Sequence, residues 1–405
     1  MSHPTMHDHD AHEDIELGEL ENDAFLPRED TSKPIFKQQS ILTRWIPPRI
    51  RKFVENISKV WLMFVVLVVF VLGLSVSAYM NVNEALAVNI SPESIALQDQ
   101  LAKSLNHTSI PGYVLEYAPY VYLHRDDVYC PSDMAKHLEN VHPTINFTAV
   151  AGGPDPLTLD NLNELNKLGG EDIFLSSKED VTTLPKFLHG QEPNPVTYRT
   201  DNAKSCVVIV VDKGNGIIDA FYMYWYIFND GPSALGHQVG NHLGDWEHNM
   251  VRFQNGTPTA VWYSQHEFGF AFTYSAVQKI GKRPVSFSAK GSHANYVVAD
   301  GLIPAHIVYD RTQQGKLWDP TLSAYYYTYE VERKEFVPAV EDTPVNYLYF
   351  EGKWGDDQFP QSKKGQEEFY GYVKWIPGPQ GPWFKHLDRT DVCLPGRECV
   401  VKGSL

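Results

Sequence analysis

The sequence has 405 residues, of which 43% are hydrophobic, so it can form one large domain or two ordinary domains with sizeable cores. It carries 50 acidic and 34 basic residues, which gives a formal net charge of -16 at pH 7. Proteins that bind nucleic acid need clustered Lys and Arg, so this composition argues against nucleic acid as a partner.

Residues 1–59 are predicted to form a disordered, acidic cytosolic tail with a basic juxtamembrane end. Acidic residues and histidines alternate there with few large apolar groups, so the segment cannot bury enough apolar surface to offset the entropy of ordering. The histidines are interpreted as part of a solvated tail, with metal binding as the alternative. They are His3, His7, His9 and His12.

Residues 60–80 predict a single transmembrane helix. The run has no charge and no proline, and at about 1.5 Å per residue it spans roughly 31 Å, which matches a hydrocarbon core of about 30 Å. It is apolar all round, whereas a core helix has one apolar stripe. Arg51, Lys52 and Lys59 precede it and Glu84 is the first charge after it, so the positive-inside rule keeps the N-terminus cytosolic. This predicts a type II signal-anchored membrane protein.

The chain after residue 80 is then predicted to be lumenal. Residues 81–112 are interpreted as a stalk that includes an amphipathic helix over about 91–105, and residues 113–405 as one large lumenal domain. Asn106 and Asn146 begin glycosylation sequons, which agrees with a lumenal position.

All four cysteines fall on the predicted lumenal side, where the redox poise permits disulfides. Spacing favours Cys393 with Cys399 and Cys130 with Cys206 as candidate pairs. Four cysteines allow three connectivities, so the sequence alone leaves the pairing open.

The lumenal part is predicted to be mainly β with a few helices. Leucines at every third position from Leu159 to Leu168 indicate a helix over about 158–168. Short runs rich in β-branched and aromatic residues then alternate with turn formers, without long amphipathic helices between them, which favours an antiparallel β-sandwich over a parallel α/β sheet. These predicted strands cover about residues 206–211, 217–228, 246–253, 259–263, 285–289 and 324–331.

The run from Gly236 to His248, GHQVGNHLGDWEH, carries the strongest indication of a site. In an extended strand alternate side chains share a face, so Asp245 and Glu247 should point the same way, with His242 in the preceding loop. An antiparallel pairing with the aromatic strand before it would bring Asp230 to the same rim. Two carboxylates about 4 Å apart repel by roughly 4 kcal/mol at an effective dielectric near 20, which a cation would relieve.

The four candidate ligands Asp230, His242, Asp245 and Glu247 favour Mg²⁺, Ca²⁺ or Mn²⁺, with Zn²⁺ or Fe²⁺ left open. The alternative is an ordinary strand with surface acids and a loop histidine. His293, in the turn Gly291-Ser292-His293, is a tentative ligand-binding residue, with a backbone-bonded loop histidine as the alternative.

Four separate motifs in the lumenal part resemble the fungal vacuolar protein sorting-associated protein 62 family. They are YAPYVYLH at 117–124, CPSD at 130–133, GNHLGDWEH at 240–248 and KGSHANY at 290–296. The resemblance runs from about residue 113 to residue 399. It implies a role in delivering proteins to the vacuole, at the vacuolar or Golgi and endosomal membrane, and it implies no reaction.

A more local resemblance covers about residues 222–247. The aromatic strand that ends in Asp230, followed by His242, Asp245, Trp246 and Glu247, is similar to the metal-site region of the necrosis-inducing NLP-type cytolysins. Those proteins are β-sandwiches that hold a divalent cation and recognise sphingolipid glycans. The resemblance implies a cation held by the same four candidate residues. Leu243-Gly244 departs from that family's Arg-His pair, and the loop here is longer.

Three functions follow as hypotheses. The first is a non-catalytic, cation-stabilised lumenal domain that binds cargo, glycan or lipid. The second is a metal-dependent hydrolase, with Glu247 or His293 as base. The third is a membrane-active protein that binds sphingolipid. Exposed aromatic residues around the cation would favour lipid or glycan binding, and an open coordination position in a cleft would favour the enzyme.

Overall fold

A computed structural model describes residues 59, 61–70, 88–234, 236–299, 301–305, 308–396 and 398–405. The chain divides into two units, Met1–Ser75 and Val76–Leu405, and each is described by itself. In the first unit residues 61–70 are helical with exposed side chains. No helix within the described ranges is long and apolar enough to cross a membrane. Most of the predicted tail, 1–59, and much of the predicted span, 60–80, lie outside these ranges.

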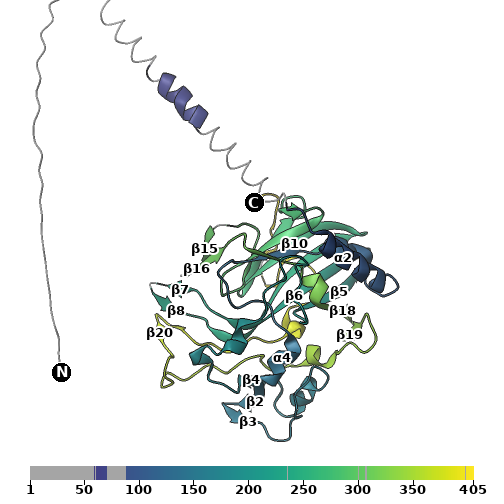
Figure 1. The fold of residues 1–405 in the computed structure, drawn as a ribbon, viewed down its shortest axis with the longest axis vertical. Coiled ribbons are helices and arrows are strands. Elements are labelled where there is room, and N and C mark those ends of the chain that lie inside the picture. Colours follow the sequence, from purple (N-terminus) through teal and green to yellow (C-terminus); the bar gives the residue numbers. More distant parts are fainter. Residues whose placement is uncertain are drawn as a thin grey trace, which may run out of the picture. The chain divides into compact units, whose positions relative to one another are not determined.

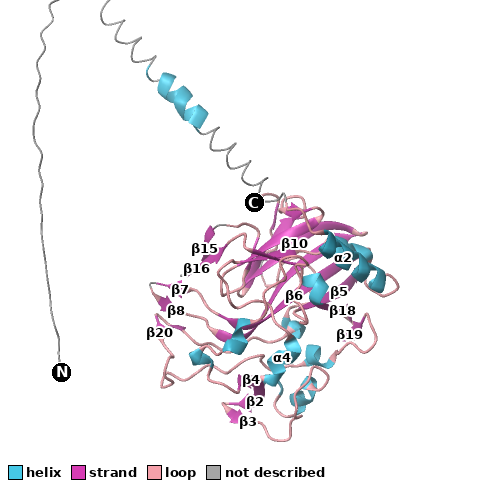
Figure 2. Ribbon diagram, in the orientation of Figure 1, coloured by secondary structure: helices cyan, strands magenta, loops and turns pink. Residues whose placement is uncertain are grey.

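The second unit is mainly β with a few helices, as predicted, and is built on a large central sheet (Figure 1, Figure 2). The strand order in this eight-stranded sheet is β19-β18-β5-β6-β9-β10-β11-β22. Its strands are β5 (Cys206–Gly214), β6 (Ile217–Asn229), β9 (His242–Gln254), β10 (Thr257–Gln265), β11 (Phe268–Thr273), β18 (Ala324–Glu330), β19 (Glu335–Pro338) and β22 (Val401–Lys402). Every strand predicted between residues 206 and 263 forms, and β9 begins earlier than predicted.

A smaller, five-stranded sheet shares a core with one face of the central sheet. It consists of β12 (Lys279–Ile280), β13 (Arg283–Ser288), β1 (Tyr120–Leu123), β17 (Lys316–Trp318) and β14 (Asn295–Tyr296). Val121 and Trp318 of this sheet are buried in one cluster with Tyr224 of the central sheet. The Tyr263 hydroxyl also donates to the Val285 carbonyl at 3.1 Å. The two sheets therefore form a sandwich-like pair of layers.

The prediction of a purely antiparallel arrangement is wrong in part. The neighbours β1 and β13, β5 and β18, and β11 and β22 are parallel. Each pair joins strands that are far apart in the chain. Strand length and turn residues predict antiparallel hairpins between strands that follow one another in the chain. They do not predict which strands from distant parts of the chain pair, or in which direction.

The opposite face of the central sheet carries the largest core cluster, in which tryptophans meet. The ring centroid of Trp225 lies 4.8 Å from that of Trp246 and 5.0 Å from that of Trp354. The described residues also form a three-stranded sheet of β3 (Thr148–Ala149), β2 (Val141–Ile145) and β4 (Phe174–Ser177). Three strand pairs accompany it: β7 (Ser233–Ala234) with β8 (His237–Gln238), β15 (Gly301–Ala305) with β16 (Val308–Thr312), and β20 (Glu368–Phe369) with β21 (Tyr372–Val373).

The helices are short except for α2 (Pro92–Leu105), which Ser91 caps by accepting from the Ser94 amide at 3.0 Å. Gln98 donates to Asp319 at 2.9 Å and Leu105 is buried in the core, so the described part of the predicted stalk packs onto the domain. The others are α3 (Gly112–Glu116), α4 (Met134–Glu139) and the 3-10 helices η2 (Leu162–Lys167), η3 (Gly170–Asp172), η4 (Val181–Thr183), η5 (Lys186–His189), η6 (Pro320–Ser323), η7 (Asn346–Tyr349) and η8 (Pro382–Phe384).

The predicted helix at 158–168 forms only as the 3-10 helix η2. Leucines at every third position match the three residues per turn of a 3-10 helix, and Leu162 and Leu165 are fully buried while Leu168 stays 39% exposed.

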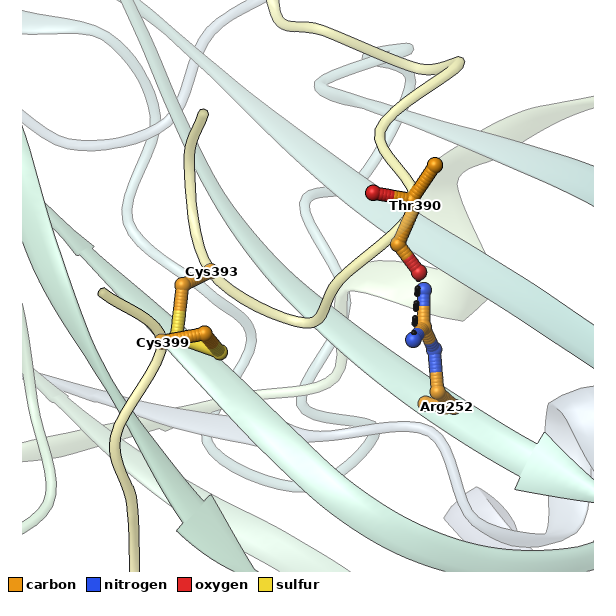
Figure 3. Close-up of a disulfide and its surroundings, with 4 residues drawn as sticks. All are labelled: Arg252, Thr390, Cys393 and Cys399. Atoms are coloured by element: carbon orange, nitrogen blue, oxygen red, sulfur yellow. Dashed lines mark hydrogen bonds between the residues drawn. A yellow bond between two sulfur atoms is a disulfide. The ribbon is translucent and has the colours of Figure 1, made fainter. Parts of the chain in front are cut away.

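One of the two expected disulfides forms. Cys393 is bonded to Cys399, and Arg252 of β9 donates to the carbonyl of Thr390 in the same segment at 2.8 Å (Figure 3). The pairing of Cys130 with Cys206 is wrong, because both are free, buried thiols. The Cys130 thiol instead donates to the Asp127 carbonyl at 3.7 Å, and Cys206 opens β5 inside the core.

A buried histidine should make this domain sensitive to acid. Burial lowers the pKa of His137 to about 3 from an ordinary value of 6.5, and its Nε2 donates to the Trp354 carbonyl at 3.0 Å. The contribution of neutral His137 to the free energy of unfolding is therefore complete above pH 6.5. It declines as the pH falls below 6.5, because between pH 6.5 and about pH 3 only the unfolded chain takes up the proton. His137→Gln keeps a hydrogen-bond donor but does not titrate. We expect the free energy of unfolding of this variant to fall by about 2 kcal/mol less than that of the wild type when the pH changes from 7 to 5.

Denaturant unfolding at the two pH values measures this difference. An equal loss of stability in the two proteins would contradict it.

Candidate functional site

The pairing of β6 with β9 sets the direction of the acidic side chains. Tyr226 lies opposite Asp245 and Tyr224 lies opposite Glu247, and both tyrosines belong to the core shared by the two sheets. Trp246 belongs to the cluster on the opposite face. As predicted, Asp245 and Glu247 therefore lie on one face of β9 and Trp246 lies on the other.

Gly244 allows β9 to begin next to the tryptophan cluster. Its φ is +74°, and a Cβ at this position would lie 2.4 Å from the carbonyl oxygen of Trp354. Only glycine fits both conditions, so this residue lets the backbone just before Asp245 approach a neighbouring segment closely.

Asp245 and Glu247 line a cavity of about 560 Å³ together with His242. The turn between β10 and β11 provides another wall, and the segment after β20 provides a third. The residues lining this site pocket, as it is called below, are Asn229, Pro232, Val239, Gly240, His242, Asp245, Trp246, Glu247, His266, Glu267, Phe268, Ser292, Tyr372, Ile376, Pro377, Pro379 and Lys385.

Asp230 does not line the site pocket, although it was expected there. It follows the last residue of β6, where Asn229 lies opposite His242 and takes the place in the wall. The Asp230 carboxylate instead accepts from Gln238 at 2.5 Å, and burial raises its pKa. The structure therefore brings three of the four predicted ligands into one cavity.

His293 lies behind the site pocket and supports Asp245. Its Nδ1 donates to Asp245 at 2.8 Å and its Nε2 donates to the carbonyl of Tyr129 at 2.8 Å, while its ring stacks on Tyr226 at 3.8 Å. Burial alone lowers the pKa of His293, but the hydrogen bond to Asp245 and the charge of Asp127 outweigh burial and raise it. An imidazolium held in this way orients Asp245 and balances its charge.

Glu247 is the most perturbed acid of the site pocket. It is 6% exposed, and burial, followed by the charge of Asp245, raises its pKa to about 8. The Ser264 hydroxyl donates to it at 2.8 Å. Perturbed acids of this kind concentrate at functional sites.

A second histidine, His266, lines the site pocket and had no sequence signal that marked it. It occupies the turn after β10 with a φ of +51°. Its Nε2 donates to Asp310 at 2.7 Å, and Asp310 also accepts from Ser292 and Tyr296, each at 2.6 Å. Burial alone lowers the pKa of His266, but the bond to Asp310 and its charge raise it overall.

The donor set suits a divalent cation in its chemistry. The Nδ1 of His242 donates to the Gly244 carbonyl at 2.6 Å, which leaves the Nε2 lone pair for a cation beside the two carboxylates. As the side chains stand, no group of three or more His, Cys, Asp or Glu within the described ranges is arranged to hold a metal ion. A bound cation would therefore require these side chains to converge further, or water to complete its coordination.

Comparison with known sequences identifies relatives. The sequence pattern described as vacuolar protein sorting-associated protein 62 matches residues 233–355. A Saccharomyces cerevisiae protein, putative vacuolar protein sorting-associated protein TDA6, is 36% identical over 322 residues, which cover 70% of this chain and 68% of that protein. Vacuolar protein sorting-associated protein 62 of the same yeast is 33% identical over 321 residues, with the same coverage of 70% and 68%.

Comparison with solved structures finds weaker likenesses. Necrosis and Ethylene inducing Protein 2 from the causal agent of cocoa's Witches Broom disease matches with a TM-score of 0.24 at 13% identity, over 47% of this chain and 69% of that chain. NLPPya in complex with mannosamine matches with a TM-score of 0.22 at 12% identity, over 52% of this chain and 75% of that chain. TM-scores this low support no conclusion about fold or function.

The ion pair between His266 and Asp310 can be tested by titration. Burial opposes the charged form of His266, and in Asp310→Asn the neutral amide no longer favours the imidazolium, so the pKa of His266 should fall. NMR titration of the labelled imidazole, assigned with His266→Asn, measures the change.

The exposed carboxylate of Asp160 offers a matched control, since Asp160→Asn makes the same chemical change away from the site pocket. An unchanged titration of His266 in Asp310→Asn would show that the ion pair does not set its charge.

Proposed function

Because the chain belongs to the family of vacuolar protein sorting-associated protein 62, we propose that it acts in sorting proteins to the vacuole. In this proposal it is a type II membrane protein whose residues 60–80 anchor it, with the domain of the second unit in the lumen. The site pocket holds a divalent cation there and binds glycan, lipid or cargo.

The observation that carries the proposal is the convergence of Asp245, Glu247 and His242 on one cavity. In the absence of a cation, burial and mutual repulsion hold Glu247 partly protonated near neutral pH. A divalent cation would offset both costs, because its charge replaces the proton. Mg²⁺, Ca²⁺ and Mn²⁺ are the ions that this set of oxygen donors with one imidazole favours.

An aromatic rim beside the cavity supports glycan or lipid as the ligand rather than an extended protein surface. Tyr372 lines the site pocket and is 44% exposed, and Tyr370, at the tip of the hairpin formed by β20 and β21, is 86% exposed. Phe369 of the same hairpin stacks on His237 of β8 at 4.3 Å. Exposed rings next to a polar cavity are typical of surfaces that contact sugars or membrane headgroups.

A metal-dependent hydrolase is a second candidate, and His266 is the observation that favours it. His266 faces the site pocket and is oriented by Asp310, as a general base or acid would be. His293 is less suited to this role than the sequence indicated, since both of its ring nitrogens are already bonded.

Removal of the two carboxylates tests the cation. We expect the purified full chain to retain a stoichiometric amount of Mg²⁺, Ca²⁺ or Mn²⁺ after dialysis, as measured by elemental analysis. Asp245→Asn with Glu247→Gln should lose it, because two of the three converging ligands become neutral. Asp160→Asn with Glu164→Gln makes the same charge change at exposed positions and should retain the metal.

Equal and negligible metal in all three proteins would refute the proposal that the site pocket holds a cation.

The same variants test the role in sorting. Cells that lack the chain should secrete a vacuolar hydrolase. The variant Asp160→Asn with Glu164→Gln should restore retention of the hydrolase, and Asp245→Asn with Glu247→Gln should not.

The lumenal position is tested through the two sequons. Asn106 and Asn146 are both exposed, as acceptors of N-linked glycan must be. We expect glycosidase treatment of the chain from a fungal host to increase its gel mobility, and Asn106→Gln with Asn146→Gln to remove most of that shift. Unchanged mobility of the wild-type chain would argue against a lumenal domain.

A further inference from the structure

The guanidinium of Arg389 is buried without a carboxylate partner. Arg389 is 4% exposed, and the one hydrogen bond of its side chain within the described residues runs from Nη2 to the Nε2 atom of His248 at 3.2 Å. Its Nε and Nη1 atoms have no hydrogen-bond partner there. Burial lowers the pKa of Arg389 to about 10, because the interior disfavours the charged form. Buried charges in proteins are ordinarily paired, so this guanidinium is an exception.

The carboxylates near Arg389 are already bonded or face solvent. Asp219 of β6 is fully buried, but its two oxygens accept from Arg252, each at 2.8 Å. Asp388 and Asp391 belong to the same segment as Arg389, and both are exposed. Neither accepts a hydrogen bond from the Nε or Nη1 atom of Arg389. Asp219 thus neutralises Arg252, and the charge of Arg389 is left without a counter-ion.

Two neighbours of Arg389 also carry unpaired donors. Burial, followed by the charge of Arg389, lowers the pKa of His248 well below its usual range, so this ring is neutral. Its Nε2 accepts from Arg389, which places its proton on Nδ1, and Nδ1 has no partner within the described ranges. The indole N–H of Trp262 is unpaired there as well, and the ring centroid of Trp262 lies 5.6 Å from the guanidinium carbon. The unpaired groups of these three side chains are therefore all donors.

Neither aromatic packing nor water satisfies this donor cluster. The guanidinium carbon lies 4.7 Å from the ring centroid of Phe221, and this contact offsets part of the charge but supplies no lone pair to the N–H groups. A water molecule must donate hydrogen bonds as well as accept them, and the side chains of Arg389, His248 and Trp262 offer it no free acceptor. It would also leave the charge uncompensated. A small anion only accepts hydrogen bonds and carries the opposite charge.

We propose that a small monovalent anion such as chloride binds at the buried guanidinium of Arg389, beside the N–H groups of His248 and Trp262. Hydrogen bonds from a cationic donor to an anion are stronger than those between neutral groups. The three side chains belong to residues that are at most 4% exposed, so the anion must fit within the packed core. This favours a monatomic ion over a bulky organic anion.

The anion would fasten the C-terminal segment to the central sheet. His248 belongs to β9 and Trp262 to β10, whereas Arg389 belongs to the segment after η8. An anion that these three residues hold neutralises Arg389 and joins that segment to both strands. Trp262 lies on the face of the sheet opposite to the one that carries Asp245, so the anion site is independent of the cation of the proposed function.

The experiment is thermal unfolding of the full chain in mild detergent, with sodium chloride replacing sodium gluconate stepwise at constant ionic strength. Gluconate is a bulky organic anion that a site in the core excludes. We expect the midpoint of unfolding to rise with the chloride concentration and then to level off, because a ligand that binds the folded state alone stabilises it. Bromide should act as chloride does, and its anomalous scattering in crystals should place it at Arg389.

Substitution of the arginine separates the site from a general effect of salt. Arg389→Met removes the charge and keeps an unbranched side chain against the rings of Phe221 and Trp262, so it should fold. It should lose the saturable rise of the midpoint with chloride. Arg125→Met makes the same change at an exposed position and should keep that rise. If Arg389→Met does not fold, the position of bromide in the wild type decides.

The outcomes separate this inference from the proposed function. The anion site is overturned if the wild type shows no saturable rise with chloride, if Arg389→Met keeps that rise, or if bromide is absent from Arg389. Asp245→Asn with Glu247→Gln should respond to chloride as the wild type does, because those carboxylates lie on the other face of the sheet. A chain that responds to chloride but retains no divalent cation would refute the cation and leave the anion site standing.

Discussion

The antiparallel pairing of β6 (Ile217–Asn229) with β9 (His242–Gln254) is the constraint on which the rest of the site depends. Its register places Tyr226 opposite Asp245 and Tyr224 opposite Glu247, which directs both acids to one face of the sheet. A slip of one residue would move Trp246 to the face that now carries the carboxylates, and both carboxylates into the tryptophan cluster. That alternative is costly, because Trp225, Trp246 and Trp354 lie within contact of one another on the opposite face. The packing of the tryptophans on one face of β9 thus fixes the register that places the carboxylates of Asp245 and Glu247 on the other face.

Buried charge around the site is balanced by donors from distant parts of the chain. His293 compensates Asp245, and Asp127 reinforces it by accepting from the Gly291 amide at 2.7 Å. Asp310 similarly holds His266, Ser292 and Tyr296. These bonds cost little once the fold is formed, whereas removal of any one partner would leave an unpaired charge in a low-dielectric environment. The two networks therefore fix Asp245 and His266, whereas Glu247 is bonded to Ser264 and His242 to the Gly244 carbonyl.

Much of this arrangement could be predicted from the sequence because it depends on short-range periodicity. Strand alternation gave the common face of Asp245 and Glu247, and short spacing indicated the bond between Cys393 and Cys399. The failures at the site and in the disulfide pairing concern long-range neighbours. The end of β6 places Asn229 in the wall instead of Asp230, and Cys130 faces a backbone carbonyl instead of Cys206. His266 and Lys385 belong to turns with no recognisable pattern, and only the folded sheet edges bring them to the same cavity.

The C-terminal part of the chain forms one wall of the site pocket. The site pocket therefore forms only when this part of the chain is folded onto the central sheet. The Asn241 backbone amide donates to the Lys374 carbonyl at 2.7 Å, and the Asn241 carbonyl accepts from the Ile376 amide at 2.9 Å. These two bonds connect the residue before β9 to the C-terminal segment that also carries Tyr372 and Lys385. Further along, the bonded pair Cys393 and Cys399 leads into β22, which pairs with β11. One continuous segment thus bonds to the strand that bears the acids and to the hairpin that bears His266. A ligand that contacts both walls must stabilise these long-range contacts by its binding free energy, so occupancy of the cavity and folding of the C-terminal segment are thermodynamically linked.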